Sequence, residues 1–397
     1  MLIALYFTLL GTLSTSAQSI EAKFSTEKAN YLAGEPLFVT LVVGNRTSEP
    51  IWLDFQSPDL AKVLCDDFAV EVPGAEPAEQ PWGCGFGGSC GRGSTEVQPG
   101  KSTTRRQLVN QQFRLQARAY SLHAQTSISV RKQGLWDSPE IEHVNVSDTL
   151  QVKVQHGSRS ELESAFKPIV AELDDPDPLR RAEAAVAVTA LAPAFLEDTL
   201  IELTNTKFSG AAVVALRKVD TPKTRAALAR IARSSDDSTI RIAAIDNLGR
   251  TRDVTYLPLL FQLMDSDNKE IQDSAAEAAG NLGGSMAVPQ LASLISSPNA
   301  VTRLAGTNGL GKSHANEAVP LLIGMLLDSD ANVRQAAASG LFLLTHREAF
   351  DGNQLADVTS LESAVSVQQR WARWWRSHGK DSKAHGLSDC APPEPLD

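Results

Sequence analysis

A repeat with a period of 31 residues constrains this chain more than any other feature of its sequence. Four sets of equivalent positions carry the repeat: prolines, leucines, mostly arginines and mostly glycines. They are Pro258, Pro289 and Pro320; Leu260, Leu291 and Leu322; Arg241, Gln272, Arg303 and Arg334; and Gly249, Gly280, Gly311 and Phe342. A fixed period of this length indicates one supersecondary unit stacked on copies of itself. The sequence therefore predicts a solenoid over much of the chain.

The residues within each repeat indicate two helices. A proline opens the first helix, where its missing N–H has no helical partner in any case. Turns rich in Asp, Ser and Asn follow, such as Asp265–Asn268, and these residues suit the N-cap of a second helix. The second helix carries small residues such as Ala275 and Ala276, which let neighbouring helices approach closely. We expect six helix pairs that form an all-α solenoid over residues 160–347.

The repeats resemble HEAT repeats of the short kind, the type shared with phycobilisome-lyase-like proteins. Three segments carry the resemblance: Val333-Arg334-x-Ala336-Ala337, Val288-Pro289-x-Leu291 and Val319-Pro320-x-Leu322. The resemblance implies a helical-repeat fold with extended surfaces for partners. It implies little about which partner is bound, since such repeats serve many functions.

A tryptophan-rich helix is predicted over residues 360–379. Trp371, Trp374 and Trp375 fall on one face of it, at positions i, i+3 and i+4. Because the open end of a solenoid has to be covered, we expect this helix to cap the last repeat. An aromatic site for a ligand or partner is the alternative. Residues 380–397 are polar and proline-rich, and we expect a flexible tail.

Residues 20–157 are predicted to form an all-β sandwich. About seven short runs of apolar and β-branched residues are separated by Gly, Pro and Asn turns. The stretch Tyr31–Leu37, with Gly34-Glu35-Pro36 at its centre, resembles the opening of immunoglobulin-like modules of exported bacterial proteins, in which an Asn such as Asn45 ends the following strand. Residues 75–103 are rich in Gly and Cys and predict a long loop.

The first 19 residues predict a secretory signal peptide, because an apolar run from Leu2 to Leu10 is followed by small residues. No later stretch is apolar for the ~18 residues that a membrane span needs. We therefore expect an exported, periplasmic or extracellular protein. Its four cysteines, Cys65, Cys84, Cys90 and Cys390, allow three disulfide pairings, and a Cys84–Cys90 bridge would close the Gly-rich loop.

Several motifs that resemble catalytic or binding sites lack their required context. Gly87-Gly88-Ser89-Cys90-Gly91 fits a nucleophile elbow but lies in a predicted loop between strands. The di-iron hydroxylases built from HEAT-like repeats use adjacent His-Glu pairs, and the sequence has none. A formal net charge of −10 disfavours nucleic acid as a partner. We expect no catalytic residues, no cofactor and no metal.

The combined interpretation is a non-enzymatic scaffold that binds another protein through its repeats. The recurring Arg241, Arg303 and Arg334 either pair with Asp residues of adjacent turns or form a basic row for an acidic partner. Two alternative functions remain open. One is a lyase or chaperone-like activity of the phycobilisome-lyase type, and the other is protease-inhibitor-like binding by the sandwich. The oligomeric state is not predicted.

Overall fold

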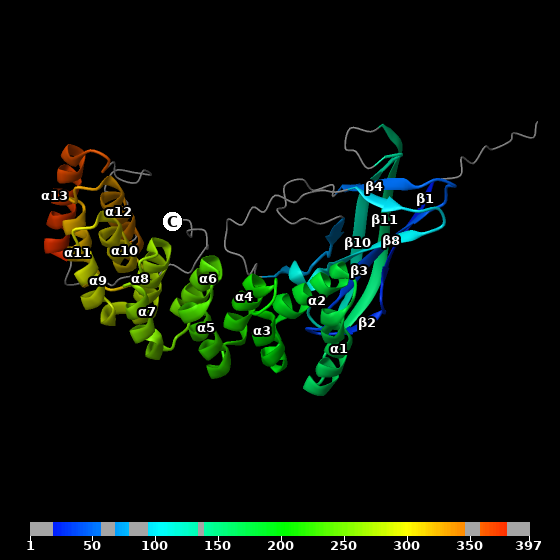
Figure 1. Cartoon of the computed structure of the whole chain (residues 1–397), viewed down its shortest axis with the longest axis horizontal. Helices are drawn as coiled ribbons and strands as arrows, with labels where there is room; N and C mark the ends of the chain where they lie inside the picture. The colour runs from blue at the N-terminus through cyan, green and yellow to red at the C-terminus, as the bar shows by residue number, and fades with distance from the viewer. Residues whose placement is uncertain (1–18, 57–67, 79–93, 134–138, 346–357, 379–397) are drawn as a thin grey trace, which may run out of the picture. The chain divides into compact units, whose positions relative to one another are not determined.

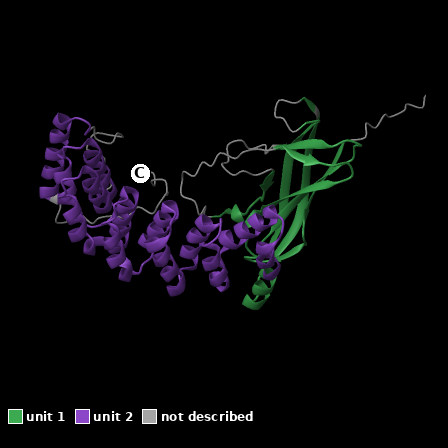
Figure 2. Cartoon of the chain, viewed as in Figure 1, with its two compact units in different colours: residues 1–80, 85–166 green, residues 81–84, 167–397 purple. Residues whose placement is uncertain are grey.

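The computed structural model describes residues 19–56, 68–78, 94–133, 139–345 and 358–378. The chain forms two compact units (Figure 2). The first comprises residues 1–80 and 85–166, and the second residues 81–84 and 167–397. The first is rich in strands and the second is helical (Figure 1). This order of an all-β region followed by an all-α repeat array confirms the predicted fold class.

Two sheets and a short β-ribbon make up the strand-rich unit. Nearly all of its strand pairs are antiparallel; β2 runs parallel to β11. The first sheet has the order β1 (Ile20–Thr26), β3 (Phe38–Asn45), β8 (Ser102–Leu108). The second has the order β2 (Asn30–Leu32), β11 (Glu140–Gln155), β10 (Ala119–Arg131), β4 (Ile51–Gln56), β7 (Thr95–Val97), and β5 (Ala69–Glu71) also pairs with β10. The ribbon joins β6 (Glu76–Pro77) to β9 (Phe113–Arg114).

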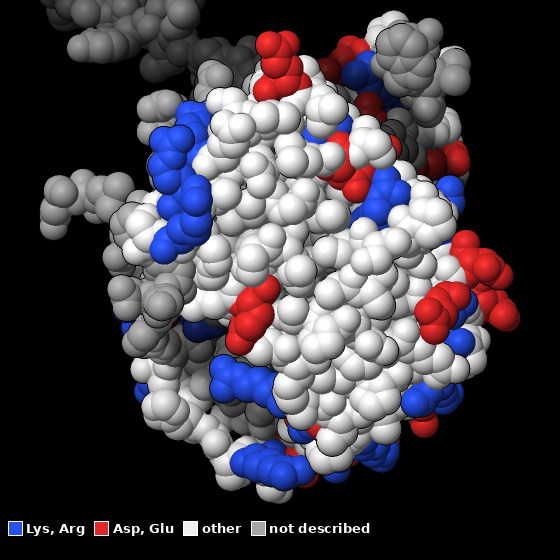
Figure 3. Space-filling model, turned by 90° about the vertical axis from the view of Figure 1, so that its left-hand side faces the viewer, with Lys and Arg blue, Asp and Glu red and all other residues white. Residues whose placement is uncertain are grey.

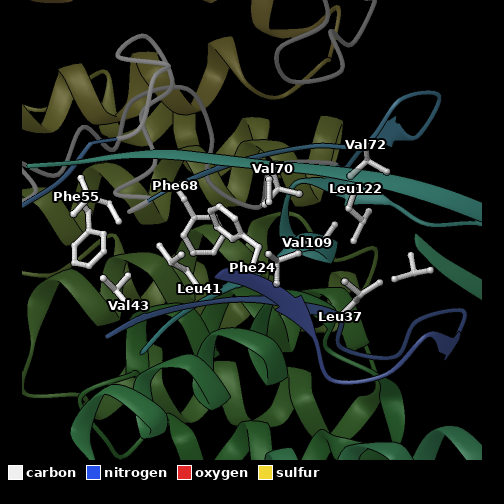
Figure 4. Close-up of a cluster of buried hydrophobic side chains, with 14 of the residues drawn as sticks. Phe24, Leu37, Leu41, Val43, Phe55, Phe68, Val70, Val72, Val109 and Leu122 are labelled. Carbon is white, nitrogen blue, oxygen red and sulfur yellow. The ribbon is translucent and has the colours of Figure 1, made fainter. Parts of the chain in front are cut away.

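Apolar side chains from both sheets form one core between them (Figure 4). Phe24 of β1 meets Phe68 edge-on, with ring centroids 5.1 Å apart. Leu41 of β3 and Leu122 of β10 are fully buried in the same cluster. Sheets that bury their inner faces against each other form a sandwich. The assignment of this sandwich to the immunoglobulin-like class stays a prediction.

The turn that follows β2 is held by a buried carboxylate. Glu35 is only 5% exposed. Its carboxylate accepts a hydrogen bond from the backbone N–H of Leu32 and forms an ion pair with Lys28. Gly34 has a φ of +86°, a conformation that glycine adopts without strain. Asn45, at the end of β3, is buried and donates to the carbonyls of Glu49 and Val97. Glu35 and Asn45 therefore hold the two ends of β3, the strand that follows the Gly34-Glu35-Pro36 turn.

Two expectations about the strands differ from the structure. Two of the short runs that predict separate strands, at 113–122 and 126–130, belong largely to one strand, β10. Ala124 and Thr126 take inward positions of that strand, where the sequence shows no large apolar residue. The segment 75–103, predicted to be a loop, contains β6 and β7 and the first residues of β8. Residues 79–93 of that segment lie outside the described residues.

The helical unit consists of two helices per repeat. The first helices are α3 (Glu197–Leu203), α5 (Pro222–Ser234), α7 (Leu257–Leu263), α9 (Val288–Leu294) and α11 (Ala318–Met325). The second helices are α4 (Ser209–Val219), α6 (Ser238–Gly249), α8 (Lys269–Gly283), α10 (Ala300–Gly311) and α12 (Ala331–Thr345). The helices α1 (Arg159–Ala171) and α2 (Pro178–Leu191) precede them, and α13 (Leu361–His378) follows.

Polar turns cap the second helices as the sequence predicts. Asn268 accepts from the N–H groups of Glu270 and Ile271 at the start of α8. Asn299 plays the same part for α10 and Asp237 for α6. Each second helix then packs against the next, from α4 through α6, α8 and α10 to α12. These contacts produce one continuous layer, which we call the second-helix layer. None of the described helices is long and apolar enough to span a bilayer.

Recurring glycines allow the close packing of the second-helix layer. A Cβ at Gly280 would lie 2.2 Å from the carbonyl oxygen of Gly309. A Cβ at Gly249 would lie 2.6 Å from the Cα of Ala278, and one at Gly311 would lie 2.8 Å from the Cα of Gly340. Backbone atoms cannot rotate away as a side chain can. The glycines at the 31-residue spacing therefore occupy helix-crossing points that admit no side chain.

We predict that Gly280→Ala destabilises the helical unit by roughly 1–3 kcal/mol or more, because the new methyl group forces α8 and α10 apart. Gly324→Ala is the matched control, since a Cβ on this exposed glycine of α11 meets nothing within 4 Å. That control should be neutral or stabilise by up to about 1 kcal/mol through helix propensity. Chemical denaturation of both variants measures the difference, and equal stability would contradict the crossing-point argument.

Candidate interaction surface of the helical repeats

A strip of carboxylates lies on two successive helices of the second-helix layer, α6 and α8. Asp246 lies on α6, and Asp273 and Glu277 lie on α8. Asp246 accepts a hydrogen bond of 2.7 Å from the hydroxyl of Ser274, and Asp273 accepts one of 2.9 Å from the side-chain amide of Asn308 on α10. We call Asp246, Asp273 and Glu277 the acidic strip. Its hydrogen bonds link each repeat to the next.

The fold holds two of these carboxyls in surroundings that disfavour their charge. Burial raises the pKa of Glu277 above its ordinary range, the negative charges of Asp273 and Asp246 add to that effect, and Lys312 opposes it. Burial also raises the pKa of Asp246, although its side chain still reaches solvent. An ionised carboxylate in such a place lacks part of the hydration it would have in water. Positive charge near the strip therefore favours the ionised carboxylates, as Lys312 does at Glu277.

The recurring cationic position of the repeat has a structural role. In each repeat the residue at this position donates to a backbone carbonyl at the end of the first helix or in the turn after it. The donors Arg241, Gln272, Arg303 and Arg334 bond to Ala232, Met264, Ser297 and Asp328 respectively. The turn between the two helices of a repeat is thereby tied to the second helix. A Gln replaces an Arg in this series because the bond needs an N–H donor and no charge.

Of the three arginines predicted as a possible partner surface, Arg303 forms an ion pair with the turn of the next repeat. Its Nε and Nη2 lie 2.7 and 2.8 Å from the two carboxylate oxygens of Asp328. Hydrogen bonds from Arg303 hold the pKa of Asp328 below its ordinary range. Arg334 is only 5% exposed. The structure thus does not bring Arg241, Arg303 and Arg334 together as an exposed basic row.

Two of the three tryptophans of α13 are buried. Trp371 is 2% and Trp374 8% exposed, and their rings meet edge-on with centroids 5.6 Å apart; Trp375 is half-buried. The helix packs on α11. Arg334 of α12 donates from Nε to the carbonyl of Val358, just before α13, at 2.8 Å. The buried rings cover the last repeat, which is the arrangement that a cap requires.

The outward side of this end of the chain carries few charges. Figure 3 shows that Lys, Arg, Asp and Glu are sparse there. Leu361 and Val365 of α13 are 55% and 39% exposed. Buried tryptophans and exposed aliphatic residues thus occupy opposite sides of one helix.

Several predicted features fall outside the described residues. They are the segment 1–18 of the predicted signal peptide, the tail from 379 onward and all four cysteines, Cys65, Cys84, Cys90 and Cys390. The disulfide between Cys84 and Cys90 therefore stays a prediction. Among the described residues, no group of three or more His, Cys, Asp and Glu side chains is arranged to hold a metal ion.

The acidic strip is the feature that the sequence reasoning missed, although the repeat contains a signal for it. Asp246 and Glu277 are 31 residues apart, and Asn308 follows at the same spacing. When every position of the repeat is compared, and not only the most regular series, polar residues recur at this position. Their burial and the influence of Asp273 depend on how closely the helices cross, which the sequence alone does not state.

We predict that Glu277→Gln raises the melting temperature at pH 7. The pKa of Glu277 in the folded state is raised above the ordinary Glu value of about 4.3. Between these two pKa values the folded state binds more protons than the unfolded state, so stability falls as pH rises from the unfolded to the folded pKa. The neutral side chain removes this cost. The gain should disappear at pH values below that range, where the carboxyl is protonated in both states.

Thermal denaturation of the wild type and the variant between pH 3.5 and pH 8 tests this expectation. Glu202→Gln serves as the control, because Glu202 is exposed on α3, outside the acidic strip. An equal response of both variants, or a gain from Glu277→Gln that persists at acidic pH, would refute the assignment.

Similarities to solved structures are weak and cover the chain in part. The complex of CpcE and CpcF of phycocyanin lyase from Nostoc sp. PCC7120 has 18% identity and a TM-score of 0.34, with coverage of 54% of this chain and 87% of that one. Human deoxyhypusine hydroxylase in complex with glycerol has 17% identity and a TM-score of 0.26, with coverage of 45% and 73%. Trypsin-activated alpha-2-macroglobulin from Escherichia coli has 12% identity and a TM-score of 0.20, with coverage of 89% and 28%.

The family comparison bears on the repeats themselves. No curated protein matches the sequence. Residues 256–341, which include α7 to α11 and most of α12, match the family described as HEAT repeats. This match agrees with the 31-residue period and with the paired helices. The family match therefore identifies HEAT repeats within residues 256–341 of this chain.

Proposed function

We propose that this protein is a non-enzymatic scaffold whose HEAT repeats bind a partner protein through the acidic strip. The supporting observation is that Asp246 and Glu277, on neighbouring helices, both have a raised pKa, with Asp273 adding to the negative charge around them. A cation delivered by a partner would lower the free energy of these ionised groups. The strip therefore favours a protein that presents Lys or Arg side chains.

The layout of the strip favours an extended basic segment over a single charge. Its carboxylates lie on consecutive second helices, and helices in contact have axes about 8–10 Å apart. Two cationic side chains on one partner segment can span such a distance. Charge complementarity of this kind sets the rate and the specificity of association more than its strength.

Affinity capture from an envelope fraction, with the full chain as bait, tests this function. We expect a basic partner to be retained by the wild type and to be lost with Asp246→Asn/Asp273→Asn/Glu277→Gln. The matched control is Glu202→Gln/Asp236→Asn/Asp267→Asn, which removes the same charge from exposed positions outside the strip. The control should retain the partner, and capture should weaken as salt concentration rises.

Two outcomes would remove the support for this function. In one, the wild type retains no protein. In the other, the strip variant and the control variant retain the same protein equally. Circular dichroism of both variants ensures that a loss of binding is not a loss of fold.

We also propose that the protein is exported, on the strength of the apolar run from Leu2 to Leu10 and the small residues after it. Mass spectrometry of the protein purified from its source tests this. Cleavage near Ala17 is the expected result. An intact Met1 in a cytoplasmic fraction would contradict export.

A further inference from the structure

The outer face of the β10–β11 pair carries a long run of uncharged polar side chains. The strands pair in register, with His123 opposite Thr149, Gln125 opposite Ser147 and Ser127 opposite Asn145. Alternate residues of β10, such as Leu122, Ala124 and Ile128, face the core, so these polar residues point away from it. We call these three cross-strand pairs the polar face. It is solvent-exposed or half-exposed throughout.

The absence of charge distinguishes this face from an ordinary solvated sheet surface. Charged residues make up 21% of the chain, and the exposed side of an antiparallel sheet can carry any polar residue. On β10 every outward position from 121 to 127 is Ser, His or Gln, and on β11 every outward position from 143 to 151 is His, Asn, Ser, Thr or Gln. Ser129, the next such position of β10, is buried. Solubility alone does not require such a selection.

Hydrogen bonds between neighbouring side chains hold the polar face in place. The Oγ of Ser127 lies 2.7 Å from Oδ1 of Asn145 and 2.6 Å from Nε2 of His143. Nδ1 of His123 lies 3.0 Å from the hydroxyl of Thr149. Side chains that are already ordered lose less entropy when they bind a ligand. This network therefore favours binding by a preformed surface.

A shallow hollow lies at one end of the polar face. It has a volume of about 260 Å³, and Glu71, His123, Gln125, Ser147 and Thr149 contribute to its lining. Hydroxyl and amide groups both donate and accept hydrogen bonds, and Glu71 adds an acceptor. Trp52 of β4, which pairs with Arg131, lies half-exposed on the same side of the sheet. The polar face itself runs from His123 to Ser127, a length of about 13 Å along β10.

We propose that the polar face binds a neutral polysaccharide chain. Sugar hydroxyls donate and accept hydrogen bonds as the Ser, Thr, Asn and Gln side chains do, and a neutral glycan requires no countercharge. The three successive pairs offer hydrogen-bonding groups along the strands rather than at a single point, which suits a chain of sugars. This binding site lies on the strand-rich unit and does not depend on the acidic strip of the repeats.

Titration calorimetry of the full chain with three neutral oligosaccharides tests the proposal. The probes are cellohexaose, chitohexaose and maltohexaose. We expect at least one to bind, and Gln125→Ala/Thr149→Val to weaken that binding about tenfold or more, because each change removes direct hydrogen bonds to the ligand. Gln98→Ala/Thr104→Val makes the same two substitutions away from the polar face and should bind as the wild type does.

Three results would overturn the proposal. The first is no binding of any probe at about 10 mM, a concentration that detects very weak complexes. The second is equal weakening by the polar-face variant and the control variant. The third is retention of a protein, with no saccharide bound, that the polar-face variant loses, which would make the face a protein interface.

Discussion

The close crossing of successive second helices is the constraint on which the repeat array depends. At the crossing of α8 and α10 a Cβ on Gly280 would lie 2.2 Å from a carbonyl oxygen of the other helix. Contact at that separation requires a glycine at that point and small residues around it. The same closeness places polar side chains of adjacent repeats within hydrogen-bonding distance. Packing and surface chemistry in this unit therefore have one geometric origin.

The carboxylates of the acidic strip show the consequence of that geometry for function. Glu277 is only partly exposed between the packed helices, and burial is the main cause of its raised pKa. Burial also raises the pKa of Asp246, although that residue is exposed at the surface. A looser array would hydrate Glu277 fully and leave it as an ordinary surface acid. The stability that tight packing gives to the layer is thus partly offset by the cost of these charges. Residues kept at such a cost are more informative about binding than fully hydrated ones.

Local patterns in the sequence predicted the helical unit well because its contacts are mainly between neighbouring repeats. Prolines, capping residues such as Asn268 and the glycine series each act within one repeat or between two adjacent ones. The strand-rich unit depends on long-range pairing as well: β10 pairs with β4 and β5, which lie far before it in sequence, besides the next strand, β11. Small or polar inward residues such as Ala124 hide the alternation that would mark a continuous strand.

The arginine series shows why a recurring residue is not by itself a candidate site. Its members recur because each ties the turn of its own repeat to the following helix, and Gln272 performs the same task without a charge. Arg334, at the last repeat, also holds the segment before α13, so one side chain serves the repeat and its cap. A polar residue of the repeat is a better candidate for function when no contact within the protein explains its polar group. Glu277 meets that condition, because no hydrogen bond within the described chain accounts for its carboxylate, whereas ion pairs and backbone bonds account for Arg303.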